Sequence, residues 1–246
     1  SSQHNQFFLI TPEVLYTLQG SDRVFCYQTY SSPAEPLEIV VVKPEMKMTM
    51  SSENIRIHLE IKFERKFSSS QFGYYIISLG QINKVGVWKL NDDQIELINL
   101  LREQQPFPIR SARILKSFAD RLTDVLDISD NFYDLDSIPE IKGSSKIVIH
   151  VTKQRHNTYN LCNVRVYPIE GGKENFRPGQ DYAEYISEAT GSRSLVCRNI
   201  RKERDKFNIL CKKTGLKERY GTIEAAEFLS LLEFVHNNPD DYAVAW

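Results

Sequence analysis

A regular alternation of apolar and charged residues over 55–67 limits the possible folds more than any other feature of the sequence. The apolar positions are Ile55, Ile57, Leu59, Ile61 and Phe63, and the charged positions between them are Arg56, His58, Glu60, Lys62 and Glu64. Successive side chains of a β-strand point to opposite faces of the sheet, so this pattern predicts a strand with one buried face. Such half-buried strands are typical of antiparallel sheets.

Runs of β-branched and alternating residues predict further strands on both sides of this one. The first half is expected to form strands over 37–50, 55–67, 72–82 and 84–90. Two helices are expected to follow: one begins near Asp92, and the other covers 111–126. The second half is expected to form strands over 146–152, 161–167, 194–200, 207–213 and 218–223, and a helix over 224–237. The sequence therefore predicts an α+β fold with two antiparallel β-meanders, each followed by a C-terminal helix.

The stretch between the two halves is acidic and contains the residues of a linker. Seven Asp or Glu residues lie between Asp120 and Glu140, with Arg121 as the one basic residue, and Pro139 and Gly143 follow near its end. Such composition is typical of solvated connections. We therefore expect a first domain over 1–126, an acidic linker over 127–145 and a second domain over 146–246.

The two halves also align with one another without a gap when Phe207 is placed on Tyr74. This register pairs Ile76 with Ile209 and continues to the pair of Leu101 and Phe234. Apolar positions of one half therefore match apolar positions of the other across two predicted strands and a helix. Repeated patterns of this kind indicate a repeated structural unit. The register favours a ββββα duplication.

The paired strand-rich halves over 37–102 and 146–237 resemble the ββββα units of the Whirly, PC4 and PUR families of single-stranded nucleic-acid-binding proteins. In those families the sheet presents basic and aromatic side chains to unstacked bases, while the helices pack against the other face or pair the repeats. For this chain the resemblance implies binding of single-stranded RNA or DNA through the solvent-exposed faces of its strands.

Charge and aromatic residues identify the candidate binding residues. The chain contains 31 Lys and Arg against 32 Asp and Glu, but ten basic residues lie between Arg193 and Arg219. Single-strand binding requires cations along the backbone and flat side chains for the bases. The candidates are Arg198, Arg201, Lys202, Lys212, Lys213 and Lys217 as cations, Tyr220, Tyr74 and Trp88 as stacking residues, and Lys62 on the alternating strand.

Two other functions fit parts of the sequence. A β-sandwich or barrel closed by a helix is similar to pleckstrin-homology or phosphotyrosine-binding domains, which recognise proteins or lipids. Pro44-Glu45 followed by Glu60-Ile61-Lys62 matches the loose carboxylate and lysine spacing of metal-dependent nucleases. The chain contains no P-loop, GxGxxG or GxSxG motif and no grouped histidines, so the sequence favours a binding protein without cofactor or metal over an enzyme.

Cysteine spacing and hydropathy predict where the chain functions. Cys26, Cys162, Cys197 and Cys211 form no CxxC pair, which favours free thiols and an intracellular location, in the nucleus or the cytoplasm. No apolar run approaches the roughly 18 residues of a membrane-spanning helix. The first residue is Ser rather than Met, which leaves a removed targeting segment open. The partners expected are a single-stranded nucleic acid, with a protein partner or a second copy of the chain as further options.

Overall fold

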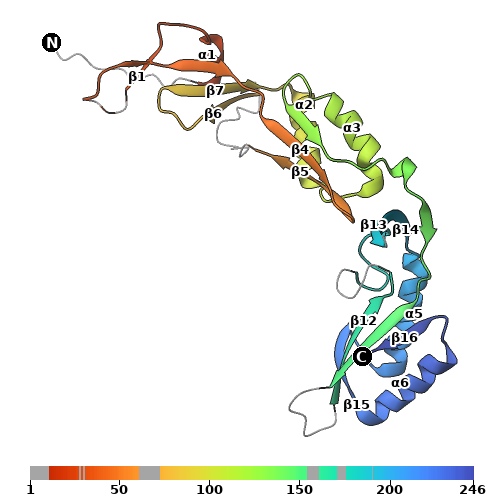
Figure 1. Cartoon of the computed structure of the whole chain (residues 1–246). Helices are drawn as coiled ribbons and strands as arrows, with labels where there is room; N and C mark the ends of the chain where they lie inside the picture. The colour runs from red at the N-terminus through yellow and green to blue at the C-terminus, as the bar shows by residue number, and fades with distance from the viewer. Residues whose placement is uncertain are drawn as a thin grey trace. The chain divides into compact units, whose positions relative to one another are not determined.

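A computed structural model describes residues 11–27, 29, 31–60, 73–153, 161–170, 176–189 and 191–246. The chain divides into two compact units (Figure 1). Unit 1 comprises Ser1–Met50, Ile55–Phe107 and Ser111–Phe132, and unit 2 comprises Ser51–Asn54, Pro108–Arg110 and Tyr133–Trp246. Both contain helices and sheets, so the α+β class is confirmed.

Unit 1 contains a small three-stranded sheet and a larger four-stranded one, besides the two-stranded antiparallel sheet of β1 and β2. The small sheet has the order β3-β7-β6, with β3 parallel and β6 antiparallel to β7, and α1 packs against it through Leu15. The larger sheet has the order β8-β5-β4-β9, with β5 antiparallel and β9 parallel to β4. The elements up to the end of β9 are α1 (Pro12–Thr17), β1 (Phe25–Cys26), β2 (Glu35–Pro36), β3 (Glu38–Val41), β4 (Glu45–Met50), β5 (Asn54–Leu59), β6 (Tyr74–Ser78), β7 (Lys84–Lys89), α2 (Asp92–Glu103), β8 (Phe107–Pro108), η2 (Ile109–Ser111), α3 (Ala112–Asp120) and β9 (Asp127–Asp130), and all but β8 and η2 lie wholly or mainly in unit 1.

Unit 2 also contains a small and a larger sheet. The small sheet has the order β10-β14-β13, with β10 parallel and β13 antiparallel to β14. The larger sheet has the order β15-β12-β11-β16, with β12 antiparallel to both β11 and β15, and β16 parallel to β11. The elements are η3 (Leu135–Ser137), β10 (Glu140–Lys142), β11 (Ile147–Lys153), β12 (Leu161–Pro168), β13 (Glu184–Ala189), β14 (Ser192–Cys197), α5 (Ile200–Thr214), β15 (Tyr220–Glu224), α6 (Ala225–Asn237) and β16 (Tyr242–Ala245).

The two units share one order of elements and one pattern of strand pairing. In unit 1 the strands β3 to β7 are followed by α2, β8, α3 and β9, and in unit 2 the strands β10 to β14 are followed by α5, β15, α6 and β16. The four-stranded sheets β8-β5-β4-β9 and β15-β12-β11-β16 have the same order, as have the three-stranded sheets. Each of these four sheets includes a parallel pair, which a simple meander lacks.

Local sequence sets the start of the corresponding helices α2 and α5. Asn91 caps α2 by accepting a hydrogen bond from the backbone N–H of Gln94, and Asn199 caps α5 by accepting one from Lys202. Asparagine is a favoured N-cap because its side-chain oxygen pairs with an N–H that the helix leaves unsatisfied. This correspondence aligns Asn91 with Asn199.

The strand predicted over 207–213 is wrong, because these residues lie within α5. Phe207, Leu210 and Cys211 recur at helical spacing and pack in the core of unit 2, while Gly215 ends the helix in the left-handed conformation. The register that placed Phe207 on Tyr74 therefore pairs a helix with a strand. Its later part pairs β7 with β15, although β7 lies at the centre of a three-stranded sheet and β15 at the edge of a four-stranded one.

The acidic stretch predicted as a linker also differs from expectation. It contains β9, which pairs with β4 in unit 1, and β10, which pairs with β14 in unit 2. Both strands lie at the edge of their sheets, where acidic side chains can remain solvated while the backbone pairs with the neighbouring strand.

A buried ion pair joins β14, α5 and the loop over 176–182. The side chains of Arg198 and Glu203 are both 0% exposed, and their two hydrogen bonds measure 3.1 and 2.7 Å. Arg198 also donates to the carbonyl oxygens of Arg177, Gln180 and Tyr182, so all five guanidinium N–H groups have partners. Glu203 accepts a further hydrogen bond from the backbone N–H of Gly179.

We expect Arg198→Met to lower the free energy of unfolding by about 3–5 kcal/mol, because it leaves a buried carboxylate without a counter-charge. Urea unfolding checks this value. Arg201→Met, an exposed change on the same helix, is the control and should remain within about 0.5 kcal/mol of the unchanged protein. The double variant Arg198→Met/Glu203→Leu should lose less free energy of unfolding than the two single variants lose together, because it leaves neither charge unpaired. A loss below about 1 kcal/mol for Arg198→Met would contradict the structural role of the pair.

Candidate nucleic-acid interface

The helices of unit 2 cover one face of its four-stranded sheet. Ile147, Ile149, Val164 and Val166 point to this face and form a core with Leu210 of α5, Leu231 of α6 and other apolar residues. Figure 1 shows α5 and α6 with this sheet, and α6 contacts β12, β15 and β16. Residues that alternate with the core positions therefore lie on the opposite face.

A row of polar and aromatic side chains crosses this opposite face. Tyr220 of β15 pairs with Arg165 of β12, Arg165 pairs with His150 of β11, and His150 pairs with Ala245 of β16. Residues directly opposite one another on neighbouring strands share a face, with Cβ atoms about 5 Å apart. Tyr220 is 49% exposed, and Arg165 and His150 are half-buried.

Two arginines surround Tyr220. The guanidinium carbon of Arg165 lies 5.2 Å from the centre of the Tyr220 ring and that of Arg219 lies 4.7 Å from it. Arg219 also donates a 2.6 Å hydrogen bond to the Tyr220 hydroxyl and a 3.3 Å one to the carbonyl oxygen of Phe176. Cation–π contacts of this kind hold planar groups together at the surface. The cluster presents two cationic groups and one phenol ring in fixed positions.

The neighbouring rows limit the extent of this accessible face. On one side Thr152, Asn163 and Thr222 are exposed. On the other side Val148 and Tyr167 are buried, and burial raises the pKa of the Tyr167 hydroxyl above its usual range. We call the exposed and half-buried residues of this surface the arginine–tyrosine face; its residues are His150, Thr152, Asn163, Arg165, Arg219, Tyr220 and Thr222.

The structure places the predicted cations of the second half on a different surface. Arg201, Lys202, Lys212 and Lys213 are all exposed on α5, and Lys217 is exposed in the turn between α5 and β15. The sheet separates α5 from Tyr220, because α5 packs on the core face. The predicted cations of α5 and the predicted Tyr220 therefore do not form one site.

Three other predicted residues are engaged in packing. Arg198 is wrong as a contact residue, because its side chain is fully buried and its donors are used within unit 2. Trp88 is 2% exposed and donates from Nε1 to the carbonyl oxygen of Val125, so it is not accessible for stacking. Tyr74 is half-buried, with its ring 5.3 Å from that of Tyr16 and Lys89 over it. Lys62 lies outside the described residues.

Arg165 and His150 are not among the binding residues predicted from the sequence. A signal for Arg165 was present, because Asn163 and Arg165 alternate with Val164 and Val166 in the predicted strand over 161–167. That alternation places Arg165 on the solvent side of its strand. Its position beside Tyr220 depends on the pairing of β12 with β15, which the sequence alone does not specify.

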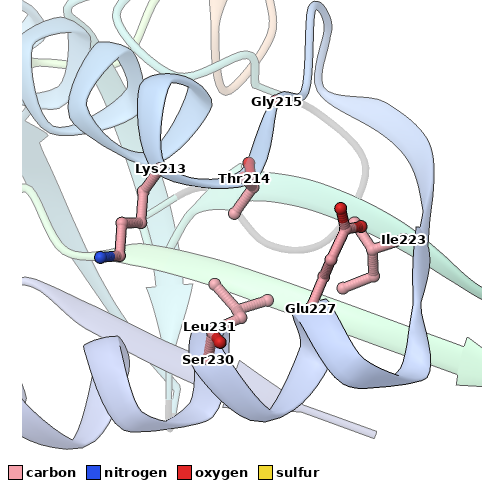
Figure 2. A pocket seen from close by; sticks show the side chains of 7 residues that line it. All are labelled: Lys213, Thr214, Gly215, Ile223, Glu227, Ser230 and Leu231. Atoms are coloured by element: carbon pink, nitrogen blue, oxygen red, sulfur yellow. The ribbon is translucent and has the colours of Figure 1, made fainter.

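Lys213 lines a pocket of about 390 Å³ on the helix side of unit 2 (Figure 2). The pocket lies between the C-terminal end of α5, β15 and α6, and its floor is formed by Ile223 and Leu231. Glu227, which faces the same space, accepts a hydrogen bond from the backbone N–H of Glu224 as part of a helix-capping box. The complete lining is Lys213, Thr214, Gly215, Ile223, Glu227, Ser230 and Leu231.

The carboxylates of the nuclease pattern lie on neighbouring strands of unit 1. Glu60 follows β5 and donates its backbone N–H to the carbonyl oxygen of Glu45 in β4, and Asp127 of β9 pairs with Glu45 on the other side. All three side chains are exposed. Among the residues that the structure describes, no group of three His, Cys, Asp or Glu side chains has the geometry of a metal site. Lys62, the third part of the pattern, is outside those residues.

All four cysteines are free and half-buried. Cys197 lies 3.6 Å from the carboxylate of Glu184. Burial, together with a hydrogen bond to Glu140 and the charges of Glu140 and Glu184, raises the pKa of the Cys197 thiol to about 11. The thiolate is the reactive form of cysteine, so this environment does not favour a nucleophile at neutral pH.

We expect Cys197 to resist alkylation by iodoacetamide at pH 8, where a thiol with a pKa of about 11 is ionised in roughly one molecule in a thousand. Its rate should rise about tenfold per pH unit between pH 8 and pH 10. Peptide mass mapping of Cys197 measures the rate, and the urea-unfolded chain provides the control. Modification of the folded chain at pH 8 as fast as in urea would contradict the expected protection.

Comparison with models of protein families, with curated proteins and with solved structures found no match. Among the described residues, no helix has the length and apolar character needed to span a membrane.

Proposed function

We propose that the chain binds single-stranded RNA or DNA, and that unit 2 contacts the strand through the arginine–tyrosine face. Tyr220 and Arg165 supply flat groups for the bases, and Arg165 and Arg219 supply positive charge for the phosphates. The four free cysteines fit a reducing compartment such as the nucleus or the cytoplasm.

The observation that carries this proposal is the contact of Arg165 and Arg219 with the half-exposed ring of Tyr220. A guanidinium group pairs with phosphate oxygens and its plane stacks on bases as well as on aromatic rings. Stacking of a base on an aromatic side chain contributes about 1–3 kcal/mol and is tolerant of sequence. An open sheet face with such residues therefore suits unstacked bases better than a regular duplex.

The α5 cations have a secondary role in this proposal. Arg201, Lys202, Lys212 and Lys213 raise the local positive potential, which increases the rate at which an anionic strand encounters the protein. They lie on the far side of the core from Tyr220 and cannot contact the same nucleotide. This separation makes the two surfaces distinguishable by substitution.

We expect a labelled single-stranded oligonucleotide to bind at low salt, with affinity that falls steeply as salt rises. Fluorescence anisotropy at two salt concentrations measures this. The variant Arg165→Gln/Tyr220→Ala should raise Kd about tenfold to a hundredfold, because it removes one cation and one stacking surface. No binding by the unchanged chain at low salt would contradict the proposed function.

The double variant Lys212→Gln/Lys213→Gln is the matched control for the loss of charge on unit 2. It removes two exposed cations from α5 without changing the arginine–tyrosine face. We expect a smaller increase in Kd than for Arg165→Gln/Tyr220→Ala, and a similar increase for strands of different base composition. A larger effect from the lysine pair would place the contact on α5 instead.

A further inference from the structure

The four-stranded sheet of unit 1 has a face that corresponds to the arginine–tyrosine face of unit 2. The sheets β8-β5-β4-β9 and β15-β12-β11-β16 have the same strand order, the same antiparallel hairpin at the centre and the same parallel edge strand. In each of these sheets, one face of the central antiparallel hairpin is buried. The opposite side of the unit 1 hairpin can therefore be compared directly with the face described above.

Alternation along β4 and β5 separates the two faces. Met46, Met48 and Met50 of β4, with Ile55 and Ile57 of β5, are all buried. The positions between them are exposed: Lys47, Thr49, Arg56 and His58. Lys47 pairs with His58, and Thr49 pairs with Arg56, so these four side chains form two adjacent rows on one face.

The charge on this face is divided along the strands. The two rows next to the hairpin turn carry the cations Lys47 and Arg56 beside His58, whereas the row at the other end carries Glu45 with Asp127 and Glu60. Among the described residues, none of the ion pairs involves Lys47 or Arg56. An anionic strand would therefore contact the rows near the turn and avoid the acidic end.

We infer that the surface of Lys47, Arg56 and His58 is a second contact for single-stranded nucleic acid; this inference rests on the proposed function. We call this surface the basic face of unit 1. The paired rows contain no Phe, Tyr or Trp among the described residues, so the contact is made chiefly with phosphates rather than with bases. Each chain then binds two short strands, one on each unit, and the unit 1 contact is independent of base identity.

A titration that counts bound strands tests this inference. The full chain is titrated at low salt with an oligonucleotide of about eight nucleotides, a length within the usual range for one small single-strand site. Native mass spectrometry should show two strands per chain. Lys47→Gln/Arg56→Gln should reduce the number to one, as should Arg165→Gln/Tyr220→Ala, and the combination of all four changes should abolish binding.

The acidic end of the same face provides the matched control. Glu45→Gln/Glu60→Gln removes two exposed charges of the opposite sign from neighbouring strands, and should retain two strands per chain with equal or higher affinity. An abasic strand of the same length should still bind the basic face of unit 1 and should lose affinity for the arginine–tyrosine face.

The outcomes separate this inference from the proposed function. If the unchanged chain binds one strand and Lys47→Gln/Arg56→Gln has no effect, the second contact is wrong while the proposed function stands. If the unchanged chain binds no strand at low salt, the proposed function itself fails. If Lys47→Gln/Arg56→Gln lowers both the number of bound strands and the urea concentration at the midpoint of unfolding, the bound strand is lost because the protein is destabilised. That result contradicts a contact role for Lys47 and Arg56.

Discussion

The buried pair of Arg198 and Glu203 fixes the loop over 176–182 on the rest of unit 2. Its hydrogen bonds reach three carbonyl oxygens and one N–H of the loop over 176–182, so this loop is fixed on β14 and α5. Arg219 in turn donates to Phe176 at the start of the loop and contacts Tyr220. The accessible Arg219 is therefore linked through this loop to the buried Arg198. A preorganised cluster loses less entropy on binding than flexible lysines do.

Unit 1 forms the same topology without this ion pair. Leu90 occupies the position of Arg198, since each directly precedes the capping asparagine and each donates its backbone N–H to the start of the preceding hairpin, at Gly73 and Ala183 respectively. Leu90 is buried in an apolar environment, which needs no partner. The fold therefore does not require the pair. Its specific consequence is the fixed loop over 176–182, where a side chain on Gly179 would meet the backbone of Arg204 at 2.7 Å.

The sequence predicts the helices and strands that depend on local periodicity. It does not predict the pairing of strands that lie far apart in the chain. The alternation at Ile55 and Ile57 and the cap at Asn91 are local signals, and both agree with the structure. The stretch over 207–213 also fits a strand, because Phe207, Ile209 and Cys211 recur with a period of two. The cap at Asn199 and the stop at Gly215 specify the helix instead. The parallel pairs of β9 and β16 join segments far apart in the chain, which no local pattern reveals.

The same distinction applies to the candidate site. Tyr220 and the α5 lysines are exposed, whereas Arg198 is buried with Glu203 although its local sequence resembles that of its exposed neighbours. One topology then yields two faces of different chemistry. Unit 2 combines cations with a tyrosine ring, while the described rows of unit 1 combine cations with His58 and no Phe, Tyr or Trp. Phosphate contacts supply affinity for any strand and stacking supplies preference for unpaired bases. In the proposed function, phosphate contacts are therefore provided by both units, and base stacking is provided by unit 2. Neither face alone would supply the full affinity together with the preference for unpaired bases.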